Sequence, residues 1–245
     1  MDATSGATLS GRAAADAGYA LAFDRLFARG RTAVLAGTHY RDTPPVDGGR
    51  WGMSVVLRPD PDCAHRLAAV TVEALGIAGA VHWPTGAVEA VHFTVRAIEE
   101  HRSVIPSDDP LVARSASALN RAAAVSPPVR LRLSGLTLTP SGVMVCAFPE
   151  DSAAAGFADR LGEELGPDGW FEAAYHRDIW YATLVHFTGE LRDPRGLVDW
   201  VAARRYLDLG TTTVGAAELL RFAYNGRQPV RVGLARAPFA GVSTP

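Results

Sequence analysis

Two histidine-containing tetrapeptides carry the residue types in this sequence that are best suited to chemistry. They are HFTV at His92–Val95 and HFTG at His186–Gly189. In an extended strand, residues i and i+2 point to the same face, so each imidazole is expected beside the hydroxyl of its threonine. A hydroxyl donates a hydrogen bond to a phosphate oxygen, and an imidazole moves a proton to or from another oxygen. Each tetrapeptide is therefore a candidate half of a phosphate-handling site.

The pairing of the two tetrapeptides is the informative feature. Two copies supply one general base and one general acid on opposite sides of phosphorus, as in-line displacement requires. An ordinary imidazole pKa near 6.5 suits this division of roles and predicts a bell-shaped pH profile. The alternative is that both histidines are buried core residues and both threonines serve strand propensity. The HFT tripeptide is expected only about 0.02 times in such a chain, so its repetition favours the catalytic interpretation.

Four further residues are weaker candidates for substrate binding. Trp83 precedes the first motif and is a candidate to stack on a base at the mouth of a cleft, although a buried tryptophan beside a proline is common. Arg177, Trp180 and Tyr181 belong to an aromatic and basic cluster leading into the second motif. Such a cluster suits base stacking plus an arginine on phosphate, and its alternative is an ordinary strand with its entry loop.

The composition excludes several mechanisms. All 24 basic residues are arginine, so Schiff-base chemistry and the lysine of phosphate-binding loops are excluded. A zinc or iron site is an alternative, built from the histidines at positions 82, 92, 176 and 186. No HxH or HExxH motif supports it, and the two cysteines do not form a CxxC pair. We therefore expect neither a metal nor a cofactor.

The length and net charge of the chain limit which substrates and partners are expected. The 245 residues carry a net charge of −2 and contain 48% hydrophobic residues, enough for a sizeable core. Near-neutral charge favours a small substrate over long duplex nucleic acid. The sequence shows no secretory leader and no membrane span, so a cytoplasmic protein without membrane contact is expected, and we expect a monomer.

The pattern of apolar residues predicts alternating helices and strands. Helices are expected over 13–29, ending at Gly30, then from near Asp62 to before Gly76 or Gly79, and over 111–124, 151–165 and 194–207. Strands are expected over 52–58, 88–95, 129–139, 142–148, 179–189, 214–223 and 228–235. Residues 1–12 are expected to be a loose tail. The irregular alternation, with hairpins at Pro140-Ser141 and Asn225-Gly226, favours an α+β fold with antiparallel sheets.

An internal repeat organises these elements. A strand, helix and strand over residues 52–95 are matched by the same series over residues 142–189. Such a duplication predicts two facing lobes. The chain is then divided into an N-terminal tail, helix and loop (1–50), a bilobal domain (51–236) and a C-terminal tail (237–245).

The paired motifs resemble the signature of the two-histidine (2H) phosphoesterase superfamily, which has one H-x-[T/S]-x motif in each lobe. The superfamily includes cyclic phosphodiesterases and 2′-5′ RNA ligase-like proteins, and the resemblance spans about residues 50–236. It implies a bilobal α+β fold with two antiparallel sheets facing a central cleft and helices outside. It also implies that His92 and His186 are acid and base and that Thr94 and Thr188 bind phosphate, without metal.

The function implied is a metal-independent phosphoric diester hydrolase. Its substrate would be a 2′,3′-cyclic phosphate or a 2′-5′ phosphodiester of a nucleotide or RNA end. Two alternatives stay open: a protein that binds nucleotides or RNA ends with little or no turnover, and a biosynthetic enzyme that uses the same histidine pair on a small phosphoester.

Overall fold

The scaffold consists of two antiparallel sheets, seen in a computed structural model that describes residues 3–174 and 178–242. One sheet has the order β2-β1-β7-β8, and its strands are β1 (Ser54–Leu57), β2 (Phe93–Ala97), β7 (Ala216–Tyr224) and β8 (Pro229–Pro238). The other has the order β5-β4-β3-β6, with β3 (Val129–Thr139), β4 (Gly142–Pro149), β5 (Trp180–His186) and β6 (Asp208–Val214). The predicted α+β fold with antiparallel sheets is confirmed.

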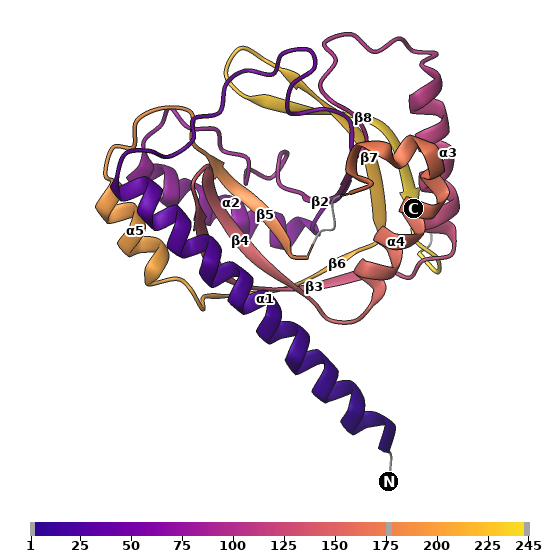
Figure 1. The fold of residues 1–245 in the computed structure, drawn as a ribbon, viewed down its shortest axis with the longest axis horizontal. Helices are drawn as coiled ribbons and strands as arrows, with labels where there is room; N and C mark the ends of the chain where they lie inside the picture. The colour runs from indigo at the N-terminus through magenta and orange to yellow at the C-terminus, as the bar shows by residue number, and fades with distance from the viewer. Residues whose placement is uncertain (1–2, 175–177, 243–245) are drawn as a thin grey trace.

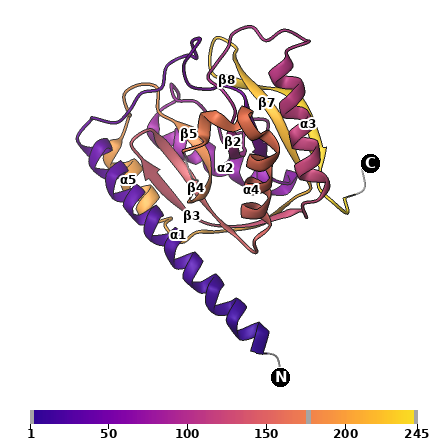
Figure 2. The same ribbon diagram turned by 45° about the vertical axis from the view of Figure 1, so that its right-hand side comes forward.

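Helices pack against both sheets. They are α1 (Ala3–Leu35), α2 (Pro61–Ala78), α3 (Pro110–Ala124), α4 (Ala153–Leu165), α5 (Pro194–Ala202) and the 3-10 helix η1 (Gly166–Glu172). Figures 1 and 2 show α1 and α5 together at one side and α3 and α4 together at the other, with strands between them. Helix α1 packs on β3, α2 packs on β5 and β6, and α3 packs on β8.

Three of the helices begin with the same local signal, an aspartate followed by proline. Asp60, Asp109 and Asp193 each accept hydrogen bonds from backbone N–H groups of the first turn of α2, α3 and α5. Proline fits the first helical position because its fixed φ is helical and its missing N–H would have no partner there. These caps explain why the starts of α2, α3 and α5 lie within one residue of the predicted positions.

The repeated units place two edge strands opposite each other. In each unit the first and last strands are antiparallel neighbours, β1 with β2 and β4 with β5. Strand β2 is at the edge of one sheet and β5 is at the edge of the other, and these two strands contact each other. Buried side chains of both sheets form one continuous apolar core. The division of the chain at residue 50 stays a prediction.

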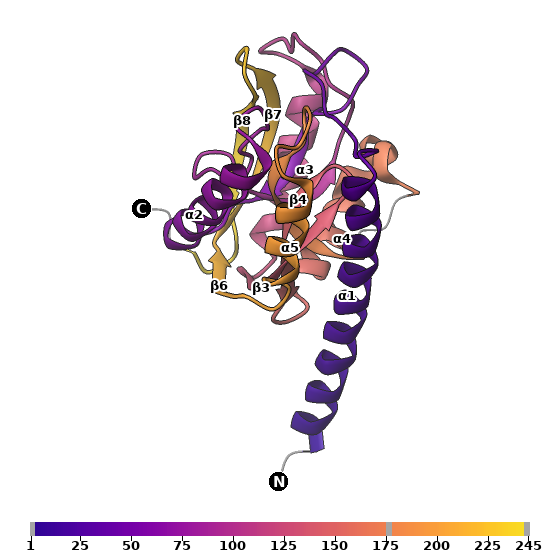
Figure 3. The same ribbon diagram turned by 90° about the vertical axis from the view of Figure 1, so that its left-hand side faces the viewer.

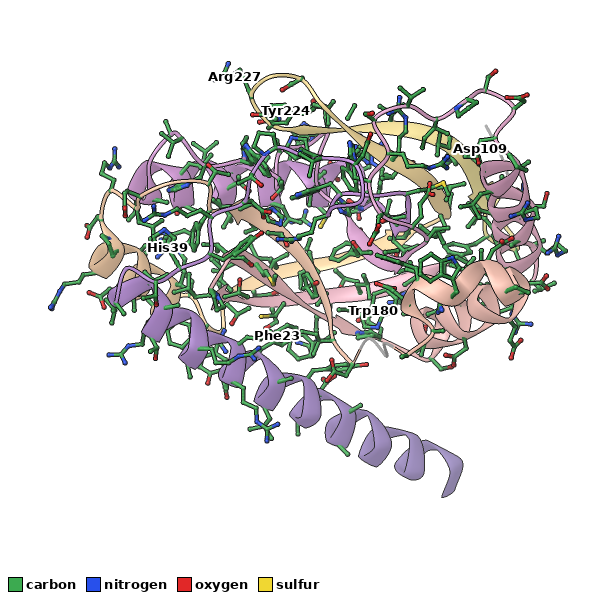
Figure 4. All side chains as sticks on the ribbon, turned by 45° about the horizontal axis from the view of Figure 1, so that its top comes forward. Phe23, His39, Asp109, Trp180, Tyr224 and Arg227 are labelled. Carbon is green, nitrogen blue, oxygen red and sulfur yellow. The ribbon has the colours of Figure 1, made fainter. Side chains whose placement is uncertain are left out.

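The structure corrects the N-terminal prediction. Helix α1 begins at Ala3 instead of following a loose tail, and it continues through Gly30 to Leu35. A Cβ at Gly30 would overlap the Leu138 carbonyl of β3, so this glycine permits close packing and is not a helix stop. On the face of α1 turned toward the sheet, Phe23 is only 1% exposed (Figure 4). The N-terminal half of α1 extends beyond the sheets (Figure 3).

Several further elements differ from their predicted ranges, and the strand predicted over 179–189 ends at His186. The helix predicted over 194–207 ends at Ala202, and the chain then forms β6, which pairs with β3. The strand predicted over 88–95 begins only at Phe93, after a turn. Both predicted hairpins are confirmed, β3 with β4 and β7 with β8.

Two glycines of α1 provide a matched stability test. Gly30→Ala places a methyl group against the β3 backbone, whereas a Cβ at Gly18 meets nothing within 4 Å. Alanine is favoured over glycine in a free helix position by about 0.5–1 kcal/mol. We expect G30A to lower the thermal unfolding midpoint and G18A to leave it unchanged or raise it. Equal effects of the two substitutions would contradict the packing of α1 described above.

Candidate functional site

Both motif histidines line one cavity of about 280 Å³ between the two sheets. The cavity lies where edge strands β2 and β5 approach each other. Three further kinds of residue line it: four hydroxyl residues, four aromatic residues and two charged residues. They are Ser54, Thr85, Thr94 and Thr183, then Trp51, Phe171, Tyr181 and Phe222, then Arg50 and Glu99. Two imidazoles separated by 94 positions in the sequence therefore line one shared cavity.

A β-bulge in each edge strand determines which side chains face the cavity. The β4–β5 register shifts between Val143 and Met144, so one residue of β5, Leu184, has no opposite partner. Such a bulge changes the alternation of the strand. Tyr181 and Thr183 face the cavity two residues apart, and the next cavity-facing residue is His186 instead of Val185.

The same shift occurs in β2. Val56 pairs with Thr94 while its neighbour Val55 pairs with Arg96, so Val95 is the extra residue. Thr94 therefore faces the cavity together with Ala97, three residues further on. Each sheet therefore has a bulge in the edge strand that contributes side chains to the cavity.

The His92 ring is fixed by a backbone acceptor. Its Nδ1–H donates to the Ala90 carbonyl at 2.8 Å. Arg231, a largely buried side chain of β8, donates to the preceding carbonyl, that of Glu89. Because a carbonyl oxygen only accepts, Nδ1 of His92 keeps its proton and Nε2 is the nitrogen that gains or loses one.

The His186 ring is held by a loop that extends the edge of β5. Trp83 and His186 exchange two backbone hydrogen bonds of 3.1 Å, and the Gly86 N–H donates to the carbonyl of the bulged Leu184 at 2.8 Å. This places the Thr85 hydroxyl 2.9 Å from His186 Nδ1. The partner is a hydroxyl, which both donates and accepts, so His186 is free to adopt either tautomer.

Burial makes both imidazoles poor proton acceptors in the ligand-free protein. It lowers the pKa of His92 to about 4, with further lowering by the positive charges of Arg231 and Arg58 and an opposing effect of the hydrogen bond to Ala90. Burial also lowers the pKa of His186 to about 3, assisted by the charge of Arg50 and by His92 itself. The expectation of an ordinary pKa near 6.5 is wrong for both rings, because it ignored their removal from water.

The two motif threonines occupy different environments. Thr94 lines the cavity, as its spacing from His92 predicts. Thr188 is outside the lining: its hydroxyl donates to the Val81 carbonyl at 2.8 Å and its N–H donates to His82 Nδ1 at 3.2 Å. Strand β5 ends at His186, so the rule that residues i and i+2 share a face does not extend to Thr188.

The weaker candidates are placed unequally. Tyr181 lines the cavity. Trp83 is 3% exposed and packs edge-on against Trp51, so it is not free to stack on a base. Trp180, at the start of β5 (Figure 4), is 5% exposed and belongs to the apolar core. Arg177 lies outside the described residues.

Sequence reasoning missed several cavity residues, most of them outside the predicted strands of the two motifs. Arg50 and Trp51 belong to a segment that we placed at the boundary of the N-terminal region, and Thr85, Phe171 and Phe222 were not singled out. The one available signal is the glycine-rich run GGRWG at positions 48–52, in which an arginine and a tryptophan are flanked by residues that permit close backbone approach. Strand pattern alone does not show which loop meets which strand.

Two features are absent from the described residues. Within 3–174 and 178–242, no group of three or more histidine, cysteine, aspartate or glutamate side chains lies close enough to hold a metal ion. His176, a member of the alternative metal set, is not among these residues. In the same part of the chain, no helix combines the length and apolarity needed to cross a bilayer.

The lowered histidine pKa values predict how stability depends on pH. Between pH 6.5 and about 4, the unfolded chain binds more protons at these histidines than the folded chain does, so their contribution to stability is complete above pH 6.5 and is lost as the pH falls. We expect the unfolding midpoint of the wild type to fall more steeply over this range than that of the double variant H92F/H186F. Parallel curves would show that the two rings are not desolvated.

Comparison with known proteins identifies the fold. No family model matches the chain, and no curated protein matches it in sequence. Among solved structures, TT0787 of Thermus thermophilus superposes with a TM-score of 0.55 at 18% identity, over 78% of this chain and 98% of that one. E. coli LigT complexed with 3′-AMP superposes with a TM-score of 0.53 at 12% identity, over 77% of this chain and 98% of that one. The chain therefore has the fold of the two-histidine phosphoesterases, as its paired motifs predict.

Proposed function

We propose that this protein is a metal-independent phosphodiesterase that hydrolyses a 2′,3′-cyclic phosphate or a 2′-5′ phosphodiester of a nucleotide or RNA end. The observation that carries the proposal is that His92 and His186 line one cavity from two different sheets. A volume of about 280 Å³ is small for a ligand pocket and suits one nucleotide unit better than a long chain.

The proposed chemistry requires one imidazole to be neutral and the other to be protonated. One neutral imidazole removes a proton from water as the water oxygen forms its bond to phosphorus. The other, protonated, imidazole donates its proton to the leaving ribose oxygen as the bond from phosphorus to that oxygen breaks. The products are a phosphomonoester and a free hydroxyl group. His92 uses Nε2 in either role, because its Nδ1 is bonded to the Ala90 carbonyl.

The negative charge of the substrate favours protonation of the two histidines. Both rings are neutral at pH 7 in the ligand-free protein, because burial lowers the pKa of each far below neutrality. A phosphodiester anion placed between them favours the protonated form and raises the pKa of both. Repulsion between the rings then allows only one of them to become positively charged, which is the state that acid–base catalysis requires.

Other lining residues suit the remaining parts of a nucleotide. Thr94 lines the cavity, and its hydroxyl is the proposed donor to a non-bridging phosphate oxygen. Tyr181 and Phe171 offer ring faces or edges to a base. E. coli LigT, a protein of this fold, has been solved in complex with ATP and with 3′-AMP, which supports small nucleotides as the proposed ligand class.

The lowered pKa values also favour one alternative, a nucleotide-binding or RNA-end-binding protein with little or no turnover. Without a ligand, neither ring is in its protonated, imidazolium form at neutral pH, so an acid catalyst forms only if the bound anion raises a pKa sufficiently. A ligand whose charge lies elsewhere would bind without reacting.

Removal of either histidine tests the catalytic proposal. We expect H92A and H186A each to reduce the rate of 2′,3′-cyclic nucleotide hydrolysis at least ~10²-fold, because each variant lacks one proton-transfer group. The control is H65A, since His65 is exposed on α2, lies outside the cavity lining and has its ring bonded to the Pro61 carbonyl of the same helix. The wild-type rate is expected to be unchanged by EDTA.

Two outcomes of this assay would contradict the proposal. Near-wild-type activity in H92A or H186A would exclude the paired mechanism. A wild type that binds 3′-AMP yet hydrolyses no cyclic or 2′-5′ substrate would establish the binding alternative instead.

The different environments of the two threonines give a separate prediction. T94V removes a hydroxyl from the cavity and is expected to lower kcat/KM about tenfold or more, the usual cost of a hydrogen bond to a charged group. T188V removes a bond to the Val81 carbonyl and is expected to lower the unfolding midpoint while kcat/KM stays within about threefold of wild type. Equal losses of kcat/KM would show that both hydroxyls bind phosphate.

A further inference from the structure

The segment 38–52, which connects α1 to β1, is fixed to the end of β5 that carries His186. The Asp42 N–H donates to the Phe187 carbonyl at 2.7 Å, and His39 Nε2–H donates to the Gly189 carbonyl at 2.9 Å. Figure 4 shows His39 beside the C-terminal end of α1. The segment therefore keeps a constant position relative to the second motif, although it comes from outside the repeated units.

The end of this segment enters the cavity in a constrained conformation. Gly49, Arg50, Trp51 and Gly52 all line the cavity. Trp51 has a φ of 72°, a left-handed conformation that non-glycine residues rarely adopt, and its ring lies edge-on to His186 with centroids 4.8 Å apart. A Cβ on Gly52 would overlap the Glu99 carbonyl. Strain of this kind persists where surrounding contacts enforce it, often at functional sites.

The Arg50 guanidinium is held from one side and open on the other. Its Nη1 donates to Asp42 Oδ1 at 3.0 Å, and the Asp42 side chain is only 2% exposed. The guanidinium carbon lies 5.6 Å from the ring centre of Tyr40 and 5.9 Å from that of Trp51. The Arg50 side chain is nevertheless 55% exposed, so much of it is open to a ligand.

Charge and hydrogen-bonding needs indicate what this arginine binds. Among the described residues that line the cavity, Arg50 supplies the only fixed positive charge. The Thr188 hydroxyl, the expected second donor to phosphate, is engaged by the Val81 carbonyl. A planar guanidinium forms paired hydrogen bonds with two phosphate oxygens, and a fixed cation stabilises charge that develops on phosphorus oxygens.

We propose that Arg50 binds the non-bridging oxygens of the phosphate group between His92 and His186, and that buried Asp42 positions the Arg50 side chain for this contact. The identity of the full substrate rests on the proposed function, whereas recognition of a phosphate group by Arg50 does not. The lowered pKa of His186, to which the Arg50 charge contributes, supports the closeness of the two side chains.

Inorganic phosphate is a direct probe of this contact, measured by calorimetric titration of the full chain. We expect R50Q to weaken phosphate binding at least about tenfold, since a lost charge-assisted hydrogen bond costs that much or more. R41Q is the matched control: Arg41 lies on the same segment, pairs with Glu190 and is not part of the cavity lining. It removes the same charge and should change the dissociation constant less than about twofold, because exposed charges are screened.

Two further variants separate a positioning effect from a loss of folding. R50K retains the charge without the planar fork, so its affinity is expected to fall between those of R50Q and wild type. D42N should weaken phosphate binding in the wild type but not further in R50Q, because Asp42 acts through Arg50. Independent losses in D42N/R50Q would contradict the positioning role.

The remaining outcomes distinguish the inference from the proposed function. Wild-type affinity in a folded R50Q or R50K, or no phosphate binding by the wild type, would overturn the assignment of Arg50. Arg50-dependent phosphate binding without hydrolysis of any cyclic or 2′-5′ substrate would support the assignment and reject the proposed phosphodiesterase.

Discussion

The removal of two imidazoles from water into one cavity is the constraint on which the site depends. Desolvation disfavours the protonated form of each ring, and each ring also disfavours a proton on the other. A shift of one pKa unit corresponds to about 1.4 kcal/mol, so the free site resists protonation strongly at neutral pH. An anion of the right size reverses this preference. In the proposed mechanism, ligand selection and activation of the acid catalyst would thereby be the same physical event.

The scaffold achieves this arrangement with two sheet edges. An edge strand has a free side that another segment can approach, and here the edge strands β2 and β5 contact each other while helices pack against both sheets. A bulge in each strand rotates the required side chains toward the shared space. The loop at Trp83 then pairs with the end of β5, and the 38–52 segment encloses the site from the other direction. Backbone hydrogen bonds thus hold the two histidines in the cavity, although desolvation makes a polar side chain costly there.

Local patterns in the sequence account for much of the fold and for the core of the candidate site. The alternating residues of β3, the Pro140-Ser141 and Asn225-Gly226 turns and the aspartate-proline caps each depend on short-range chemistry, and the structure contains the corresponding elements. The paired motifs likewise indicated which histidines to bring together. What failed required knowledge of distant contacts. Gly30 looked like a helix stop because its packing against β3 was unknown, and Thr188 was placed by a strand rule that ends at His186. Arg50 is brought to the cavity only by the tertiary path of a loop.

The most direct test of the account is the titration of the two imidazole rings by NMR, assigned with H92Q and H186Q, with and without sulfate. Sulfate is a tetrahedral anion whose charge is constant across the range of interest. We predict that both rings titrate well below pH 6.5 in the free protein, and that saturating sulfate raises the pKa of each. Rings that titrate near 6.5, or that do not respond to the anion, would contradict a shared desolvated cavity.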